Sequence, residues 1–338
     1  MIRIHTIFLL AALALAALSG SASSAMPLQA ELYGTPGPFQ VDAAEYALRD
    51  VARQRDIPLK LYMPAGKGPF PVIIFSHGLG GSRDGYEYLG RHWASHGYIS
   101  VHPTHIGSDA SVLKKGGRAM DALARAADDP QNAINRPRDV SSVIDQLTSM
   151  TLGAGPLHGK VDIGRIGVAG HSFGANTALA ISGQTFVGPL GRSFKLADRR
   201  VKAAVLLSAP ANRRNADILD RAYGSIRIPC LFITGTNDHS PIGTCLAQDR
   251  RIPFDNMYGV DCYLLTMNGA DHMVFSGRRF DPAHRDGDKV YHQLILSSSI
   301  AFWEAYLRDD AIAKGWLADG EFKEDLDGDG TFEIKQKE

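Results

Sequence analysis

The sequence predicts an α/β protein with a mostly parallel, doubly wound sheet. Two observations carry this prediction. Apolar runs alternate with helix-forming stretches from residue 57 to residue 307, and a glycine-flanked serine lies between one such run and the stretch that follows it. Strands that alternate with helices through short connections are typical of parallel sheets covered by helices on both faces. Neither an internal repeat nor a break in composition divides this region, so we expect one domain.

The elements are expected in a regular order. The predicted strands cover residues 57–63, 71–76, 98–101, 163–169, 201–207, 230–234 and 263–267, and the predicted helices cover residues 85–96, 138–150, 175–182 and 290–307. The first strand alternates in polarity, as an antiparallel strand at a sheet edge does, whereas the second is a continuous apolar run typical of a buried parallel strand. The insertions at 107–137 and 211–227 do not indicate a large cap domain, so we expect an open site.

The N-terminal residues 1–25 have the features of a signal peptide. Arg3 and His5 precede an apolar run of twelve residues, 7–18, and small residues follow up to Ala25. This run is short for a bilayer span, so we expect cleavage near Ala25, no stable membrane insertion afterwards, and a secreted or periplasmic protein. An uncleaved anchor is the alternative. After it we expect an extended lead-in at 26–44, the main domain at 45–310 and a polar acidic C-terminal tail at 311–338.

Composition and charge give no indication of a nucleic-acid or membrane-surface partner, and they do not define the pairing of the cysteines. The 338 residues include 36 basic and 36 acidic side chains, and this balance indicates neither a nucleic-acid nor a membrane-surface partner. Three cysteines permit one disulfide in an oxidising compartment, and none has a redox or zinc-binding spacing. Cys245–Cys262 is the pairing we would expect, although spacing alone does not define it, and Cys230 is expected to be a buried thiol.

Chemistry is indicated first by the pentapeptide Gly-His-Ser-Phe-Gly at residues 170–174. A predicted strand precedes it and a predicted helix follows it, which is the context of a nucleophile elbow. The flanking glycines suit a strained turn in which backbone packs against backbone. We therefore predict that Ser172 is a nucleophile.

A serine hydroxyl needs a base, and the base needs an orienting acid. In this type of fold the acid and then the histidine follow the serine along the chain, each after a strand. Asp238 follows the predicted strand 230–234, and His272 follows the strand 263–267. We predict Asp238 as the acid and His272 as the base; Asp271 is the rival acid, but its side chain should diverge from that of its neighbour.

An oxyanion hole requires two backbone N–H donors. The residue after the nucleophile, Phe173, supplies one by the usual arrangement. The glycine-rich turn at residues 77–81, after the strand 71–76, is expected to supply the other from Leu79. A turn without this role is the alternative.

These motifs resemble the α/β-hydrolase superfamily. The stretches 75–81, 93–98 and 170–174 are similar to bacterial predicted dienelactone hydrolases and to platelet-activating factor acetylhydrolases, over roughly residues 45–307. The resemblance implies an α/β-hydrolase fold and a serine esterase. Two positions depart from these families: dienelactone hydrolases have a cysteine where this chain has Ser172, and the acetylhydrolases carry their acid near position 208, where this chain has serine. Neither substrate is therefore carried over.

The sequence thus predicts an exported serine hydrolase that cleaves short-acyl or exposed carboxylic esters. We expect its substrates to be small molecules or lipid-like esters, and we expect it to need neither a cofactor nor a metal. Amide, thioester or polyester hydrolysis by the same residues stays open, as does a non-catalytic binding module. The acidic stretch 325–330 resembles the start of a calcium loop, but Gln336 replaces the expected bidentate glutamate. A calcium-dependent attachment role for the tail is a further alternative. The natural substrate and the oligomeric state are not indicated.

Overall fold

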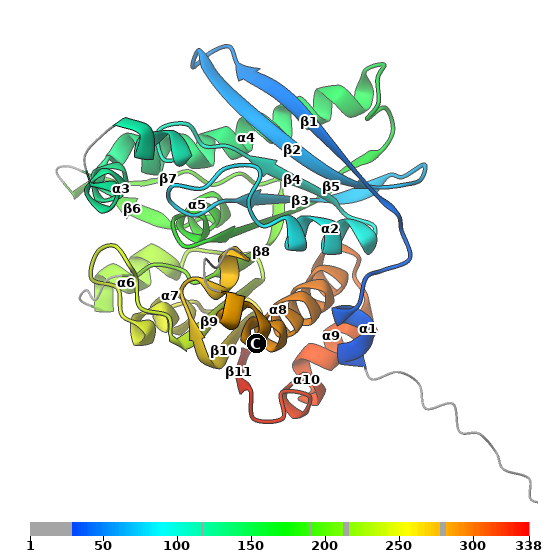
Figure 1. Cartoon of the computed structure of the whole chain (residues 1–338), viewed down its shortest axis with the longest axis vertical. Helices are drawn as coiled ribbons and strands as arrows, with labels where there is room; N and C mark the ends of the chain where they lie inside the picture. Colours follow the sequence, from blue (N-terminus) through cyan, green and yellow to red (C-terminus); the bar gives the residue numbers. More distant parts are fainter. Residues whose placement is uncertain (1–28, 116–117, 189–190, 212–215, 278–281, 338) are drawn as a thin grey trace, which may run out of the picture.

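The structure, a computed structural model, describes residues 29–115, 118–188, 191–211, 216–277 and 282–337, so the predicted signal peptide lies outside the described residues. Within these ranges the main sheet has nine strands in the order β1-β2-β4-β3-β5-β8-β9-β10-β11 (Figure 1). Its strands are β1 (Val41–Asp50), β2 (Arg55–Pro64), β3 (Phe70–Ser76), β4 (Ile99–Pro103), β5 (Val161–His171), β8 (Val201–Leu207), β9 (Cys230–Asn237), β10 (Cys262–Asp271) and β11 (Gly330–Lys335). A separate small hairpin pairs β6 (Thr185–Val187) with β7 (Ser193–Lys195).

The six central strands, β4, β3, β5, β8, β9 and β10, are parallel to one another, and antiparallel strands close both ends of the sheet. β1 and β2 form one end, at the top of Figure 1, and β11 forms the other. Because parallel strands all end at the same edge of a sheet, the loops after β3, β5, β9 and β10 gather there. The prediction of a mostly parallel α/β sheet is confirmed.

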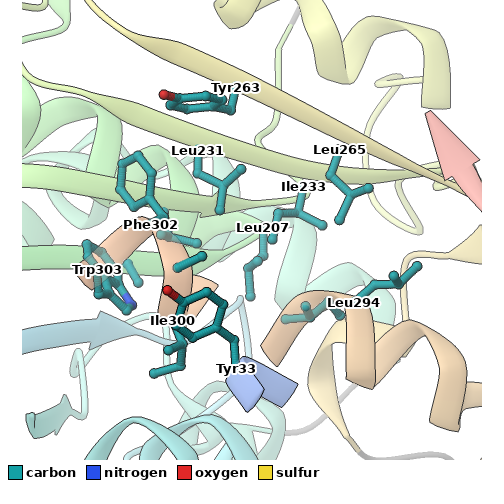
Figure 2. Packing of buried hydrophobic residues seen from close by; sticks show 14 of the residues in the cluster. Tyr33, Leu207, Leu231, Ile233, Tyr263, Leu265, Leu294, Ile300, Phe302 and Trp303 are labelled. Atoms are coloured by element: carbon teal, nitrogen blue, oxygen red, sulfur yellow. The ribbon is translucent and has the colours of Figure 1, made fainter. Parts of the chain in front are cut away.

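Helices cover both faces of the sheet. The helical elements are α1 (Gln29–Gly34), α2 (Glu87–Ser95), η1 (Ala110–Lys115), α3 (Ala119–Asp128), α4 (Pro130–Leu152), α5 (Phe173–Ser182), α6 (Ala216–Tyr223), η3 (Ala247–Arg251), α7 (Ile252–Asp255), η4 (Val274–Ser276), α8 (Pro282–Leu307), α9 (Ala311–Ala318) and α10 (Glu321–Glu324). Residues of α1, α2, α8, α9 and α10 pack into one buried cluster, and residues of α4, α5, α6 and α7 pack into another. Figure 2 shows part of the first cluster, in which Phe302 and Trp303 of α8 lie on the same face of the sheet as Leu207 and Leu231.

Strand residues alternate between the two clusters, which explains why the central strands read as continuous apolar runs. Ile73 and Phe75 belong to the first cluster, whereas Val72 and Ile74 belong to the second. A strand covered on both faces has no solvent-facing positions. The helices that lie wholly within the two predicted insertions in the described parts of the chain, η1, α3 and α6, are short.

Two predicted boundaries were wrong, the end of the N-terminal lead-in and the start of the helix predicted at 138–150. The predicted lead-in, 26–44, contains α1 and the start of β1, and Tyr33 of α1 is buried in the first cluster. Helix α4 begins at Pro130, within the predicted insertion, and not near residue 138. Asp129 caps it by accepting a hydrogen bond from Gln131 N at 2.9 Å, and proline is favoured in a first helical turn. Pro137 lies inside this helix, and a proline ordinarily indicates a helix boundary, which explains the predicted start at residue 138.

The predicted tail, 311–338, was also wrong as far as residue 335, because this segment is part of the folded sheet. β11 pairs antiparallel with β10, and α9 and α10 bury Trp316 and Phe322 in the first cluster. The calcium-loop alternative fits this arrangement poorly. Both carboxylate oxygens of Glu333 accept hydrogen bonds from Arg251, at 2.9 and 3.0 Å, and the Asp325 carboxylate accepts one from Trp316 Nε1 at 3.0 Å. The carboxylates of Glu333 and Asp325 therefore bind protein groups.

We predict that Phe332→Ala destabilises the whole chain. Phe332 is buried, its ring stacks on Tyr263 at 5.7 Å and meets Phe322 edge-on at 4.7 Å. Truncating a buried phenylalanine costs about 3–5 kcal/mol of unfolding free energy. Urea unfolding measures the loss, and the exposed neighbour Thr331, replaced by alanine, is the matched control. A Phe332→Ala variant as stable as Thr331→Ala would contradict the assignment of this segment to the core.

The expected Cys245–Cys262 disulfide is absent from the described structure, where all three cysteines are free and buried. Cys262 instead lies opposite Cys230 across the parallel β9–β10 pair. Burial raises the pKa of Cys262 to about 12, so this thiol is unreactive at neutral pH. None of the helices in the described ranges is long and apolar enough to cross a membrane.

Candidate active site

Ser172 lies in a strained turn between β5 and α5. Its backbone φ is 55°, a left-handed value that is rare for residues other than glycine, and its N–H donates to Leu207 O at 2.9 Å. The turn packs so tightly that a Cβ on Gly174 would lie 1.9 Å from the Ser76 carbonyl oxygen. A Cβ on Gly170 would lie 2.2 Å from the Gly174 carbonyl oxygen. The two glycines therefore permit a turn that holds the serine at the C-terminal edge of the sheet.

The structure brings the predicted nucleophile, base and acid together. Ser172 Oγ lies 3.1 Å from His272 Nε2, and His272 Nδ1 lies 2.7 Å from Asp238 Oδ1. Asp238 directly follows β9, and His272 directly follows β10. Since the carboxylate only accepts, Nδ1–H donates to it and Nε2 is left to accept the serine proton. The rival acid, Asp271, faces elsewhere and accepts from the N–H groups of Met273 and Val274.

The Asp238 carboxylate is fully buried and accepts from two hydroxyls as well as from the imidazole. Thr234 Oγ1 donates to Oδ2 at 2.8 Å, and Ser208 Oγ donates to Oδ1 at 2.9 Å. Ser208 Oγ also lies 2.9 Å from His272 Nδ1. Such donors offset the desolvation of a buried carboxylate, and their directions fix the plane of the carboxyl group.

Arg250 is a buried cation next to this group that sequence reasoning missed. Its Nη2 lies 3.4 Å from Asp238 Oδ1, its Nε donates to the Asp238 carbonyl at 3.1 Å, and its Nη1 donates to the Ser208 carbonyl at 3.1 Å. Nη2 also lies 3.3 Å from His272 Nδ1. Both nitrogens carry hydrogens in the tautomer above, so we interpret this contact as charge next to the ring and not as a hydrogen bond. Arg250 thus compensates the buried charge of Asp238.

The predicted oxyanion donors lie on neighbouring segments. β3, which leads into the loop of Leu79, is the parallel neighbour of β5, and Ser76 pairs with Gly170. Phe173 is the first residue of α5. In the described parts of the chain, neither the Leu79 N–H nor the Phe173 N–H donates a hydrogen bond to another protein group. Both N–H groups are therefore free to bind a ligand oxygen.

Tyr86 connects this loop to the elbow. Gly78 N–H donates to Tyr86 Oη at 3.2 Å, and Tyr86 Oη lies 2.8 Å from His171 Nδ1. The His171 ring packs on His272 with centroids 4.8 Å apart. Burial, together with the neighbouring His272 and Arg250, holds the pKa of His171 well below its usual range. The Tyr86 hydroxyl therefore donates a hydrogen bond to Nδ1 of neutral His171, which fixes the two segments relative to each other.

A buried histidine in β4 makes stability depend on pH. His102 stacks on Phe75 at 5.2 Å, and burial lowers the pKa of His102 to about 3. The folded chain then binds fewer protons than the unfolded chain between that value and the ordinary 6.5, so stability falls as the pH falls through this range. Between about pH 7 and about pH 5, His102 contributes a loss of about 2 kcal/mol to the free energy of unfolding.

We predict that His102→Gln removes this part of the pH dependence. Urea unfolding of both proteins at the two pH values measures it: the wild type should lose about 2 kcal/mol more than the variant on acidification. The variant's absolute stability does not matter for this comparison, because only the difference between the two pH values is used. Equal losses in the two proteins would show that His102 does not carry the effect.

Comparisons with known proteins match parts of this chain. The family model Chlorophyllase matches residues 33–191, a range that includes Ser172 but ends before Asp238 and His272. The chain is 31% identical over 128 residues to Chlorophyllase-1, chloroplastic, of Citrus sinensis, covering 37% of this chain and 32% of that protein. It is 28% identical to the platelet-activating factor acetylhydrolase of Canis lupus familiaris, and the match covers 62% of this chain and 49% of that protein. It is 26% identical to Cutinase 2 of Thermobifida cellulosilytica, and the match covers 78% of this chain and 89% of that protein. The chain therefore spans about a third of the chlorophyllase that it matches.

Proposed function

We propose that this chain, which belongs to the α/β-hydrolase superfamily, hydrolyses carboxylic esters through a covalent acyl-enzyme on Ser172. The observation that carries the proposal is the continuous set of contacts from Ser172 Oγ through His272 to Asp238, at 3.1 and 2.7 Å. The names of the matched proteins, an acetylhydrolase and a cutinase among them, support the choice of ester chemistry.

The proposed reaction has two halves. Ser172 Oγ attacks the ester carbonyl while His272 Nε2 takes its proton, and the N–H groups of Leu79 and Phe173 stabilise the negative charge that develops on the carbonyl oxygen. The tetrahedral intermediate collapses when His272 returns the proton to the leaving alcohol. Water then attacks the acyl group, with His272 as base again, and releases the acid and free Ser172. Asp238 stabilises the imidazolium in both halves.

Hydrolysis of p-nitrophenyl esters of graded acyl length tests this proposal. We expect turnover with a burst of one p-nitrophenol per chain when deacylation is slow, and labelling of Ser172 by a fluorophosphonate, located by peptide mass spectrometry. We expect short acyl chains to be preferred, because the described helices that lie wholly within the two insertions, η1, α3 and α6, are short. Inactivity on every ester, or a label on another residue, would overturn the proposal.

We also propose that the chain is exported and cut near Ala25, from the composition of residues 1–25. The folded part of the mature protein would then extend from α1 to β11, a wider range than the 45–310 expected from the sequence. Mass spectrometry of protein recovered from the periplasm or the medium tests this. An intact N-terminus in a cytoplasmic fraction would contradict it.

A further inference from the structure

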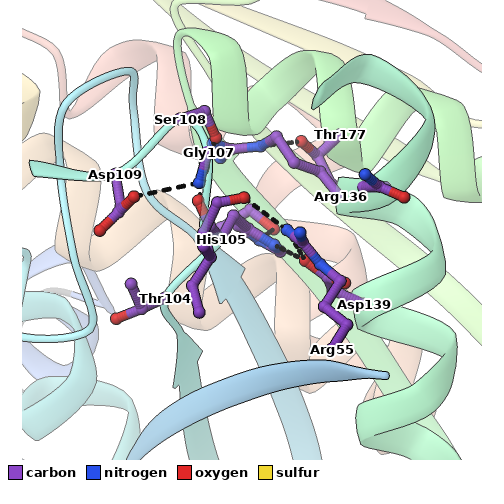
Figure 3. Close-up of polar contacts among 12 residues, drawn as sticks. Arg55, Thr104, His105, Gly107, Ser108, Asp109, Arg136, Asp139 and Thr177 are labelled. Atoms are coloured by element: carbon purple, nitrogen blue, oxygen red, sulfur yellow. Dashed lines mark hydrogen bonds and ion pairs between the residues drawn. The ribbon is translucent and has the colours of Figure 1, made fainter. Parts of the chain in front are cut away.

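Arg136 of α4 is a buried arginine, 1% exposed, whose guanidinium binds three separate segments. Nε donates to Thr177 Oγ1 at 2.8 Å, Nη1 donates to Ser108 Oγ at 2.8 Å, and Nη2 donates to the His77 carbonyl oxygen. Figure 3 shows Arg136 with Ser108 and Thr177, next to the His105–Asp139–Arg55 contacts. Burial lowers the pKa of Arg136 to about 9, which leaves it charged at neutral pH. A charge is costly to bury, so these directed contacts call for an explanation.

On one side, Arg136 holds the loop that carries Leu79. His77, whose carbonyl accepts from Nη2, lies two residues before Leu79. Ser108, whose hydroxyl accepts from Nη1, accepts with its own carbonyl the Gly80 N–H at 2.9 Å. The backbone is thus anchored to the same guanidinium on both sides of Leu79.

On the other side, Arg136 holds Phe173. The guanidinium carbon lies 4.8 Å from the centre of the Phe173 ring, a cation–π distance. Thr177, which accepts from Nε, donates its hydroxyl to the Phe173 carbonyl at 3.1 Å. The ring and the carbonyl of Phe173 are therefore both tied to Arg136.

The histidines of this region keep their orientation through separate contacts. His105 Nδ1 contacts Asp139 Oδ2 and its Nε2 contacts Ser76 Oγ, both at 3.0 Å. His105 N–H donates to His77 Nε2 at 3.0 Å, so His77 Nδ1–H donates to the Gly78 carbonyl. These contacts stiffen the start of the loop, but they do not reach Phe173. Tyr86 joins Gly78 to His171, whereas Arg136 joins the loop to Phe173 itself.

We propose that Arg136 is a positioning residue that fixes the N–H groups of Leu79 and Phe173 relative to each other, and so sets the geometry of the oxyanion hole. The inference rests on the proposed function. Donors must lie about 2.7–3.1 Å from the oxyanion, so a small displacement of either segment lowers transition-state stabilisation more than substrate binding. The planar fork of arginine reaches three acceptors at once, which the single ammonium of lysine does not do in this geometry.

The test compares Arg136→Met, Arg136→Lys and Thr177→Val on p-nitrophenyl butyrate. We expect kcat to fall about 10–100-fold in Arg136→Met, less in Arg136→Lys and about 3–10-fold in Thr177→Val, with KM within about threefold throughout. A boronic acid that forms a tetrahedral adduct on Ser172 supplies a second readout. Its inhibition constant should rise in proportion to the loss of kcat/KM, because the adduct uses the same N–H donors.

Val143→Ala is the control for general destabilisation, because Val143 is a buried residue of α4 that belongs to the second core cluster. This variant should lose thermal stability yet keep kcat and boronate affinity within about twofold. If Arg136→Met does not fold, Thr177→Val, which changes one hydroxyl to a methyl group, still decides. An active wild type whose Thr177→Val and Arg136→Lys variants keep kcat and boronate affinity would overturn this inference alone. A wild type that cleaves no ester would overturn the proposed function and this inference with it.

Discussion

Ser172→Ala is expected to lower kcat/KM for a p-nitrophenyl ester by about 10⁴-fold or more. Alanine removes the only atom that forms the covalent bond, and the residual rate comes from the oxyanion donors and from substrate binding. Ser172 Oγ takes part in the hydrogen bond to His272 Nε2 at 3.1 Å, so its loss should change stability by about 1 kcal/mol. The thermal midpoint should therefore stay near that of the wild type, and the loss of rate can be assigned to chemistry.

Ser208 provides the matched control, because in the described structure its hydroxyl also contacts His272. Its Oγ lies 2.9 Å from Nδ1, but the residue is fully buried and so lies out of reach of a substrate. We expect Ser208→Ala to lose about tenfold in kcat, as for one hydrogen bond to the acid, and to keep its fluorophosphonate label on Ser172. Substantial turnover by Ser172→Ala, or a label on the Ser172→Ala protein, would show that another group is the nucleophile.

The contrast between these two serines illustrates what can be predicted from sequence. Ser172 is found because its turn needs glycines at fixed neighbouring positions, which leaves a local pattern. Asp238 and His272 are found because each directly follows an apolar strand, in the order that this fold imposes. Such signals are short in sequence, and a single chain carries them in full.

The roles of Ser208, Arg136 and Arg250 leave no such pattern. Arg250 lies 42 residues from Ser208, and Arg136 lies 59 residues from His77. Arginine is ordinarily a surface residue, so composition and periodicity assign these side chains to solvent. Position 208 drew notice through a family resemblance, but its contact with both Asp238 and His272 required the packing of β8 against β9.

The edges of the sheet were mispredicted for a related reason. β1 has no buried residue, so its polarity alternates too weakly to be recognised as a strand. Three of the aspartates in the C-terminal segment, Asp325, Asp327 and Asp329, indicate a solvated tail. The apolar residues between and around the charges, such as Phe322 and Phe332, were the informative ones, because a two-faced sheet needs its last strand covered.

Asp238→Asn is expected to lower kcat by about 10⁴-fold with little change in KM. The asparagine amide keeps the shape of the carboxyl group, but it can present N–H to His272 Nδ1 and so favours the tautomer in which Nε2 cannot accept the serine proton. Asp271→Asn is the control, since Asp271 is adjacent in sequence to His272 and binds two backbone N–H groups instead of the ring. It should keep kcat within about threefold. The reverse result would make Asp271 the acid.

Asp238→Asn should also destabilise the fold, because it leaves the fully buried Arg250 guanidinium without its carboxylate. Breaking a buried pair by removing one partner costs about 3–5 kcal/mol, whereas replacing both partners by apolar groups is often neutral. The double variant Asp238→Asn, Arg250→Met should therefore recover most of the unfolding free energy and none of the activity. Urea unfolding and ester hydrolysis on the same samples measure the two effects. If stability and activity returned together, the loss in Asp238→Asn would come from misfolding and not from the imidazole, and Asp238 would not be the orienting acid.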